Sequence, residues 1–331
     1  MTESVETYNF YPALQRNVTP TASGSEVVSY TSDLGNGGPI LTLIHGYPQS
    51  SFITPISANT GNHTKRAVDH ALLDALAQVF DTKSSSSSSP SLPPRQVILA
   101  GHDRGARICH RLAVDATSKT SSPNSSSSPS LPEPKFFFSS LNISITGLIM
   151  LDILPTKSQW DFFSVPSLSQ NHFHWPLLAN VDLAVPMITA FGIDKWVRGG
   201  HLRLAGSASN SITRVMSDGA VDIHVKLFES GNNGETIKWT CEDYKAGGQK
   251  EVDEQVEDLS KGRRVEVDTS GSGSAVDGDE GEGGKKGDQW VGDGVELEVV
   301  GVEDGRGHFL PEEAYDVVGE RVVRFLERFG L

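Results

Sequence analysis

Short apolar runs recur along the chain, and they alternate with segments whose apolar residues follow a helical period. Several runs are apolar without interruption, which is typical of strands that are buried on both faces of a parallel sheet. The predicted strands are residues 26–30, 39–44, 97–100, 144–151 and 295–300.

Helical periodicity predicts helices over residues 64–80 and 104–115. A closing helix is expected from Pro311, because proline suits the first turn of a helix. Its predicted apolar face carries Val317, Val318, Val322, Phe325 and Phe329. Strands and helices that alternate in this way predict an α/β fold, with a mostly parallel sheet and helices on both of its faces.

Three polar segments interrupt the alternation. Residues 84–94 and 117–134 are rich in serine and proline, and residues 269–288 are rich in glycine and aspartate. They lower the hydrophobic content of the 331-residue chain to 37%. Segments of this composition bury too little apolar surface to offset the entropy of ordering, so we expect disordered loops there.

The charge distribution narrows the possible partners. The formal net charge is −14, and residues 251–304 contain 17 acidic and 5 basic side chains, so we expect a solvated acidic segment there. No basic stripe interleaved with aromatic residues occurs, which argues against nucleic acid as a ligand. The two cysteines, Cys109 and Cys241, have no metal-like spacing, so neither a disulfide nor a zinc site is expected.

The sequence has no basic N-terminal flank followed by an apolar core, and no apolar run of about 18 residues. We therefore expect a cytoplasmic protein that does not span a membrane. The sequence indicates no oligomeric state.

The most informative motif is G-H-D-R-G at residues 101–105, which directly follows the strand at 97–100 and precedes a helix. This is the pattern of a nucleophile elbow, with Asp103 in the position that serine usually takes. A carboxylate is already ionised at neutral pH and can displace a leaving group from an alkyl carbon. Asp103 therefore indicates the opening of a carbon–halogen bond or an epoxide. The alternative is a glycine-rich turn with a capping aspartate, and the flanking strand and helix favour the elbow.

Two arginines follow the elbow. Arg104 and Arg107 are three residues apart, so they share a face of the helix beside Asp103. Two guanidinium groups there could hold a carboxylate by paired hydrogen bonds, which suits a small 2-halo acid as substrate. The alternative is that both arginines form ion pairs at the surface.

Six motifs resemble those of haloacetate dehalogenases, particularly fluoroacetate dehalogenases, which are α/β hydrolases. They occur in that family's order and span most of the chain. Six matches in order are far harder to obtain by chance than one match. The motifs are HGYPQ at 45–49, GHDRGAR at 101–107, LDILPT at 151–156, HW at 174–175, CEDYKAG at 241–247 and GHFLPEE at 307–313.

The resemblance implies an α/β-hydrolase core at residues 1–155 and 251–331, with a helical cap inserted at 156–250. It also implies that Asp103 attacks the halogen-bearing carbon, that His308 activates water to hydrolyse the resulting ester, and that Asp152 orients His308. The alternatives are a strand-terminating turn for Asp152 and a loop histidine before a helix for His308. No metal or organic cofactor is implied, because water and three side chains complete the cycle.

The leaving halide also needs hydrogen-bond donors, since a small anion is strongly solvated in water. By resemblance these are His174, Trp175 and Tyr244, whose side chains are all capable donors. Without the resemblance, His174 and Trp175 would form a packed aromatic pair, and Tyr244 would be an ordinary half-buried tyrosine. The backbone N–H groups of Arg104 and Tyr47 are expected to stabilise the oxyanion, by analogy with the fold.

Two other functions remain open. An epoxide hydrolase uses the same Asp-Asp-His logic but needs acids for the opening oxygen, commonly two cap tyrosines, and the expected cap contains only Tyr244. An inactive relative is the other alternative, because residues 51–65 are too few for a helix and a strand that the family would have there. A second shortened region follows Val265, so the sheet is expected to lack one or two strands.

Overall fold

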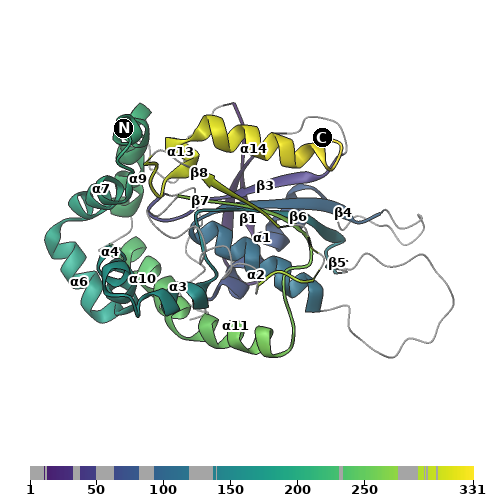
Figure 1. Ribbon diagram of the computed structural model, residues 1–331, viewed down its shortest axis with the longest axis horizontal. Coiled ribbons are helices and arrows are strands. Elements are labelled where there is room, and N and C mark those ends of the chain that lie inside the picture. Colours follow the sequence, from purple (N-terminus) through teal and green to yellow (C-terminus); the bar gives the residue numbers. More distant parts are fainter. Residues whose placement is uncertain are drawn as a thin grey trace.

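The computed structural model describes residues 11, 13–32, 38–49, 63–81, 93–118, 137–138, 140–230, 234–274, 290–293, 295, 297–302 and 305–331. Its strands are β1 Gln15–Pro20, β2 Glu26–Thr31, β3 Ile40–Ile44, β4 Arg95–His102, β5 Phe137–Phe138, β6 Ile143–Leu151, β7 Asp268–Ser274 and β8 Leu297–Val302. The central sheet has the order β3-β4-β6-β7-β8 with all of these strands parallel, and β5 pairs antiparallel with β6 (Figure 1). β1 and β2 form a separate antiparallel hairpin.

Helices cover both faces of the sheet. The elements α1 (Lys65–Val79), α2 (Arg104–Ser118) and α11 (Lys250–Ser260) lie on one side, and α14 (Tyr315–Glu327) lies on the other (Figure 1). The pleat of β4 explains this arrangement, because successive side chains of a strand point to opposite faces. Val97 and Leu99 pack with α1 and α2, whereas Ile98 and Ala100 pack with Phe325 of α14.

A second group of helices follows β6. They are α3 Thr156–Phe162, α4 Pro166–Asn171, α5 His174–Ala179, α6 Val181–Phe191, α7 Ile193–Leu204, α8 Ser211–Val215, α9 Ala220–Ser230 and α10 Glu235–Gly248. They gather at one end of the sheet (Figure 1) around an apolar core of their own, which includes Leu178, Ile188, Val197 and Ile237. These helices fall within residues 156–250, and the exact division into core and cap stays a prediction.

The predicted alternation of strands and helices is confirmed, with two differences in the closing segment. The single helix predicted from Pro311 is two, α13 (Leu310–Glu313) and α14, because the backbone leaves the helical conformation at Ala314, where φ is −135°. The predicted apolar face was wrong at Val317, which is 40% exposed. Successive residues of a helix are about 100° apart, so Val317 falls outside the stripe of α14 that contains Val318, Val322 and Phe325. Val322, Phe325 and Phe329 pack on the sheet as expected.

The prediction of a disordered loop at 269–288 was wrong over its first residues, which form most of β7. This strand lies inside the sheet and pairs with β6 on one side and β8 on the other. Pairing on both edges satisfies its backbone donors and acceptors, so the strand needs little apolar side-chain area of its own. Thr269 and Ser270 are buried there. β7 also supplies a strand where the sequence indicated that one was missing after Val265.

The remaining predicted loops lie mostly outside the described residues. Residues 84–92 and 119–134 are among them, as are residues 50–62, where a further strand was expected to be missing. Within the described part, Thr117 and Ser118 belong to the last turn of α2 rather than to a loop, and β3 has β4 as its one strand partner.

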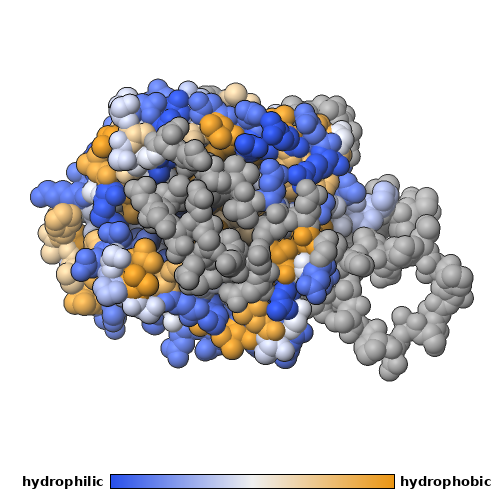
Figure 2. Space-filling model, in the orientation of Figure 1, coloured by the Kyte–Doolittle hydropathy of each residue, from blue (hydrophilic) through white to orange (hydrophobic). Residues whose placement is uncertain are grey.

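No helix in the described residues is both long enough and apolar enough to cross a bilayer. The part of the surface that is coloured in Figure 2 is largely polar, with apolar patches scattered over it. One apolar stripe lies on α6, where Leu183, Met187 and Phe191 are spaced by four residues and are each about half exposed.

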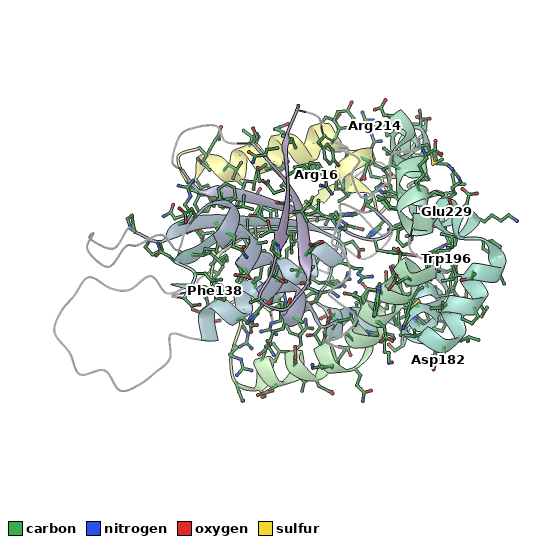
Figure 3. The ribbon with its side chains drawn as sticks, turned by 180° about the vertical axis from the view of Figure 1, so that it is seen from behind. Arg16, Phe138, Asp182, Trp196, Arg214 and Glu229 are labelled. Carbon is green, nitrogen blue, oxygen red and sulfur yellow. The ribbon has the colours of Figure 1, made fainter. Side chains whose placement is uncertain are left out.

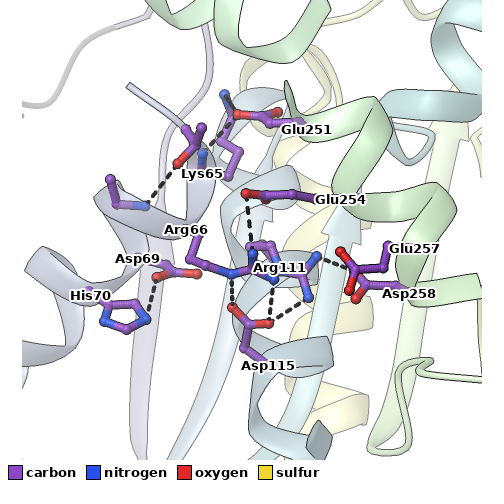
Figure 4. A network of polar contacts seen from close by, with 12 residues as sticks. Lys65, Arg66, Asp69, His70, Arg111, Asp115, Glu251, Glu254, Glu257 and Asp258 are labelled. Atoms are coloured by element: carbon purple, nitrogen blue, oxygen red, sulfur yellow. Dashed lines mark hydrogen bonds and ion pairs between the residues drawn. The ribbon is translucent and has the colours of Figure 1, made fainter. Parts of the chain in front are cut away.

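Buried ion pairs fasten α11 to the core (Figure 4). Arg111 of α2 donates to Asp258 of α11 and, at 2.6 Å, to Asp115 of its own helix. Asp115 also accepts two hydrogen bonds from Arg66 of α1, at 2.8 and 3.0 Å. Because each carboxylate here is matched by a guanidinium group, the network joins three helices without an unpaired buried charge.

We expect Arg111→Met to destabilise the protein by about 3–5 kcal/mol, since it leaves Asp258 and Asp115 buried with fewer partners. Urea unfolding followed by circular dichroism measures this change. The control is Arg324→Met, which removes an exposed pair with Glu320 and should change the free energy of unfolding by less than about 1 kcal/mol. An equally small effect at both positions would contradict the structural role of the network.

Asp69 stands apart in the same region. It is fully buried in α1, and neither carboxylate oxygen accepts a hydrogen bond from a described residue. Nε2 of the His70 ring lies 3.7 Å from Oδ1 of Asp69. Burial, with a smaller contribution from the charge of Asp115, raises the pKa of Asp69 well above its usual range. The folded chain therefore holds a proton on Asp69 to a higher pH than the unfolded chain does.

The pKa of Asp69 is higher in the folded than in the unfolded chain. The burial of Asp69 therefore lowers the free energy of unfolding of the protein as the pH rises above about 4. Asp69→Ala removes that loss and suits a helix, so we expect it to stabilise the protein at pH 8 by about 1–3 kcal/mol. The gain should shrink at pH 4.5. Unfolding in urea at both pH values tests this, with Asp182→Ala on exposed α6 as control. A gain that does not change with pH would refute the argument.

Candidate active site

Glycines allow the chain to turn sharply between β4 and α2. Asp103 has a φ of +47°, in the left-handed region that strained elbows use. A Cβ on Gly101 would lie 2.5 Å from the backbone of Ala106, and one on Gly46 would lie 2.5 Å from Cβ of Asp103. Side chains are therefore excluded on both sides, and the bend places Asp103 at the carboxyl end of the sheet, where sites of α/β proteins collect.

The carboxylate of Asp103 is buried but well paired. Its Oδ2 accepts a hydrogen bond from the backbone N–H of Tyr47 at 2.9 Å, and its Oδ1 accepts one from Nη1 of Arg107 at 2.9 Å. Burial alone would raise the pKa of Asp103, but His308, Arg107 and the Tyr47 amide together hold it well below its usual range. Asp103 is therefore an ionised group at any pH near neutrality.

His308 lies between two carboxylates. Its Nδ1 is 2.6 Å from Oδ2 of Asp152, which ends β6, and its Nε2 is 3.9 Å from Oδ1 of Asp103. A carboxylate at Nδ1 fixes the ring proton there and leaves Nε2 able to take up a proton. Burial lowers the pKa of His308, but the Asp152 hydrogen bond and the charges of Asp103 and Asp152 outweigh it, so the pKa is raised.

The main chain of His308 is fixed as well. Its N–H donates to the carbonyl of Leu204 at 2.9 Å, and its carbonyl lies 2.7 Å from Nε2 of His102. The other nitrogen of His102 faces the Gln49 side chain at 3.0 Å, and Gln49 in turn donates to Glu312 at 2.5 Å. Burial lowers the pKa of His102 to about 4 and raises that of Glu312 to about 7. Because a carbonyl oxygen can only accept, the hydrogen bond between these residues runs from Nε2 of His102 to the His308 carbonyl.

Both arginines contact the same pocket of side chains. The guanidinium carbon of Arg107 lies 4.6 Å from the ring centre of Trp175, and that of Arg104 lies 4.7 Å from the ring centre of Tyr244. Arg104 is also paired with Asp243, and the buried Nε of Arg107 has no hydrogen-bond partner among the described residues. Both arginines form ion pairs, Arg104 with Asp243 and Arg107 with Asp103, but these pairs are largely buried and do not lie at the surface.

The three expected halide donors come together. His174, Trp175 and Tyr244 are buried, and the Tyr244 ring centre lies 6.0 Å from that of His174 and 5.3 Å from that of Trp175. Burial lowers the pKa of His174 well below its usual range and raises the pKa of Tyr244 well above its own. His174 is thus neutral and Tyr244 keeps its hydroxyl proton.

Arg203 of α7 determines which nitrogen of His174 can donate. Its Nη2 donates to Nδ1 of His174 at 3.3 Å, so the single ring proton of the neutral imidazole lies on Nε2. The same arginine donates to the carbonyl of Asn171 at 2.7 Å. Sequence analysis did not identify Arg203, because nothing distinguishes it from other helical arginines.

Trp196 was missed in the same way. Its indole N–H donates to the Tyr47 hydroxyl at 2.6 Å, and Figure 3 shows it among the cap helices. Trp196 and Arg203 are seven residues apart and therefore lie on the same face of α7. That spacing is the one sequence signal that could have linked them, and it is common in ordinary amphipathic helices.

In the part of the chain that the structure describes, no three histidine, cysteine, aspartate or glutamate side chains form a group that could hold a metal ion. The polar groups around Asp103 are instead hydrogen-bond donors and one histidine base. This set can bind a small anion, attack an electrophilic carbon and activate water.

No protein-family model matches the sequence. Among solved structures, the chain is similar to a candidate epoxide hydrolase from Pseudomonas aeruginosa, with 21% identity, coverage of 98% of each chain and a TM-score of 0.70. A point mutant of that protein with bound MFA matches at 21% identity and a TM-score of 0.70, covering 97% of this chain and 98% of the other.

A candidate acyltransferase from Salmonella enterica is also similar, with 19% identity, a TM-score of 0.67 and coverage of 97% of this chain and 98% of that one. A candidate alpha/beta hydrolase from Nostoc matches at 20% identity and a TM-score of 0.66, covering 95% of this chain and 98% of the other. The names of these proteins imply different reactions, but the proteins share one architecture. The protein therefore has the α/β-hydrolase fold.

Proposed function

We propose that this protein is a hydrolase that removes the halogen from short 2-haloacids, such as haloacetates, through an aspartyl ester. The observation that supports this proposal best is the placement of two arginines beside an ionised aspartate. Arg107 touches the carboxylate of Asp103, and both Arg104 and Arg107 stack on aromatic side chains that can donate to a halide. A substrate that carries both an acid and a halide on neighbouring carbons fits this set.

In the first step, the substrate carboxylate binds Arg104 and Arg107. The substrate carboxylate accepts hydrogen bonds from Arg107 in place of Oδ1 of Asp103, so that Oδ1 is free to attack. Oδ2 stays bound to the Tyr47 amide. Oδ1 attacks the halogen-bearing carbon, a C–O bond forms, and the halide leaves with the bonding electron pair. Donation from Nε2 of His174, the indole of Trp175 and the Tyr244 hydroxyl stabilises the halide as its charge develops.

In the second step, His308 removes a proton from water, and the hydroxide attacks the carbonyl carbon of the ester. The Tyr47 and Arg104 amides stabilise the oxyanion. The intermediate then collapses as the bond between the ester carbon and the substrate oxygen breaks. The proton of the added hydroxyl passes to that oxygen, which restores the carboxylate of Asp103 and releases a 2-hydroxy acid. Asp152 stabilises the protonated His308 until the proton passes to solvent. Each atom of the product is thereby accounted for by substrate, water and the enzyme carboxylate.

Epoxide hydrolysis is the second candidate, and one observation favours it. Tyr47, which comes from the core, lies beside Tyr244, with ring centres 5.7 Å apart. The sequence indicated one tyrosine of the required pair, and the structure brings up a second. One point speaks against this candidate: an epoxide carries no carboxylate for Arg104 and Arg107 to bind.

The decisive experiment compares halide release from fluoroacetate and chloroacetate by the protein and by Asp103→Asn. We expect release by the protein and a loss of about 10³-fold or more in the variant, since the nucleophile is removed. Diol formation from styrene oxide is measured in parallel. Diol without halide would support the epoxide candidate instead, and neither product from a protein that is folded by circular dichroism would indicate an inactive relative.

A second prediction concerns the pKa of His308, which the charge of Asp103 helps to raise. Formation of the ester removes that charge, and so does Asp103→Asn. We therefore expect the His308 pKa, measured by NMR titration, to be lower in Asp103→Asn than in the parent protein. Lowering the pKa as the ester forms would supply the neutral base when the second step needs it. An unchanged pKa would refute this link between the two steps.

A further inference from the structure

The loop that carries His308 is joined to the end of cap helix α7 through main-chain contacts. The N–H of His308 donates to the carbonyl of Leu204, and the N–H of Ala208 donates to the carbonyl of Gly305, both at 2.9 Å. Residues 204–208 follow α7 directly, and residues 305–308 precede α13. The two loops are therefore paired like short strands, although they belong to different parts of the fold.

Two glycines allow this close approach. A Cβ on Gly206 would collide with the backbone of Gly305 and Gly307, and a Cβ on Gly307 would collide with the backbone of Gly206 and Leu204. These neighbours are main-chain atoms, which cannot move aside as the end of a flexible side chain can. The backbones of the two loops thus touch without side chains between them.

Glu313 of α13 binds both loops at once. Its side chain is completely buried, and its Oε2 accepts hydrogen bonds from the N–H groups of Gly307 at 2.8 Å and Gly206 at 3.0 Å. Its Oε1 accepts from the N–H of Phe309 at 3.2 Å. Two of these amides flank His308 in sequence and the third belongs to the cap. Hydrogen bonds to a carboxylate are among the stronger ones in proteins.

Other contacts hold Glu313 and α7 in place. Arg214 of α8 donates to the main-chain carbonyl of Glu313 at 2.7 Å, and Figure 3 shows this arginine beside the C-terminal helices. At the other end of the contact, Arg203 directly precedes Leu204 and donates to His174. The helix that ends at the His308 loop is therefore the helix that orients a proposed halide donor.

We propose that Glu313 is a positioning residue, which holds the His308 loop against the end of α7 and so aligns His308 only while the cap is seated on the core. The inference rests on the proposed function, because the ester mechanism divides the work between two groups. Asp103 performs the first step without His308, and His308 is needed for the second. Loss of the Glu313 contacts therefore impairs ester hydrolysis and spares ester formation.

Glu313→Gln tests the inference with little change in volume. A glutamine presents an NH2 group in place of one oxygen, so at least one of the three amides faces a donor instead of an acceptor. A displacement of about 1 Å in a catalytic group can cost roughly a hundredfold in rate. We expect steady-state halide release to fall by about 10–100-fold. The first turnover should still release one halide per site, and mass spectrometry should detect the Asp103 ester.

The matched control is Glu320→Gln on exposed α14, which should keep full turnover and accumulate no ester. Gly206→Ala disrupts the contact from the cap side and should show the same burst and the same ester. If Glu313→Gln does not fold, Gly206→Ala is the variant that tests the inference. If the folded variants instead lose the first turnover as strongly as steady-state release, the positioning role of Glu313 is overturned.

His308→Gln separates this inference from the proposed function. It removes the base directly and should accumulate the ester on Asp103. If His308→Gln forms no ester from either haloacetate, the proposed mechanism itself is wrong. If His308→Gln forms the ester and the Glu313 and Gly206 variants do not, the mechanism stands and the inference about Glu313 fails.

Discussion

The whole site depends on keeping one carboxylate, that of Asp103, both buried and ionised. Removing a charge from water costs several kcal/mol unless partners replace the solvent. Here the partners are the Arg107 guanidinium, the Tyr47 amide and the nearby His308. Each comes from a different segment, which explains why the glycines around the elbow matter. Only backbones that approach this closely bring an amide of one loop to the carboxylate of another.

His308 and Asp103 are both fixed through their main chains as well as their side chains. The N–H of Asp103 donates to the Leu151 carbonyl, and its own carbonyl accepts from the Arg107 N–H, both at 3.2 Å. The main chain of His308 contacts Leu204 on one side and His102 on the other. The two glutamates of the motif at 307–313 divide this task. Glu312 reaches His102 through Gln49, and Glu313 binds the amides that flank His308. Glu312 and Glu313 thus both support the loop of His308, Glu312 through contacts with the core and Glu313 through its contact with the cap.

Local patterns predicted the alternation of elements and the elbow, whereas most of the residues that gather around the elbow were predicted only through the resemblance of six motifs to a known family. Sequence analysis failed at β7, since hydrophobic periodicity counts side chains, and Thr269 and Ser270 are held in the sheet by backbone pairing on both edges. It also missed Arg203 and Trp196, whose role arises from the packing of α7 against other segments. At Val317 the predicted apolar face was too wide, because the adjacent residues Val317 and Val318 of one helix point about 100° apart.

The geometry also limits the kind of acid that the proposed reaction can use. Arg107 lies 2.9 Å from the attacking carboxylate, so an acid group bound to Arg107 sits next to the reacting carbon. In a substrate whose halogen is farther from the acid group, either the halogen-bearing carbon lies away from Asp103 or the carboxylate lies away from the arginines. Asp243 pairs with both Arg104 and Lys65, which balances the charge of Arg104 when no anion is bound. Under the proposed function, the position of the halogen relative to the acid, more than the size of the substrate, is therefore the property that this site selects.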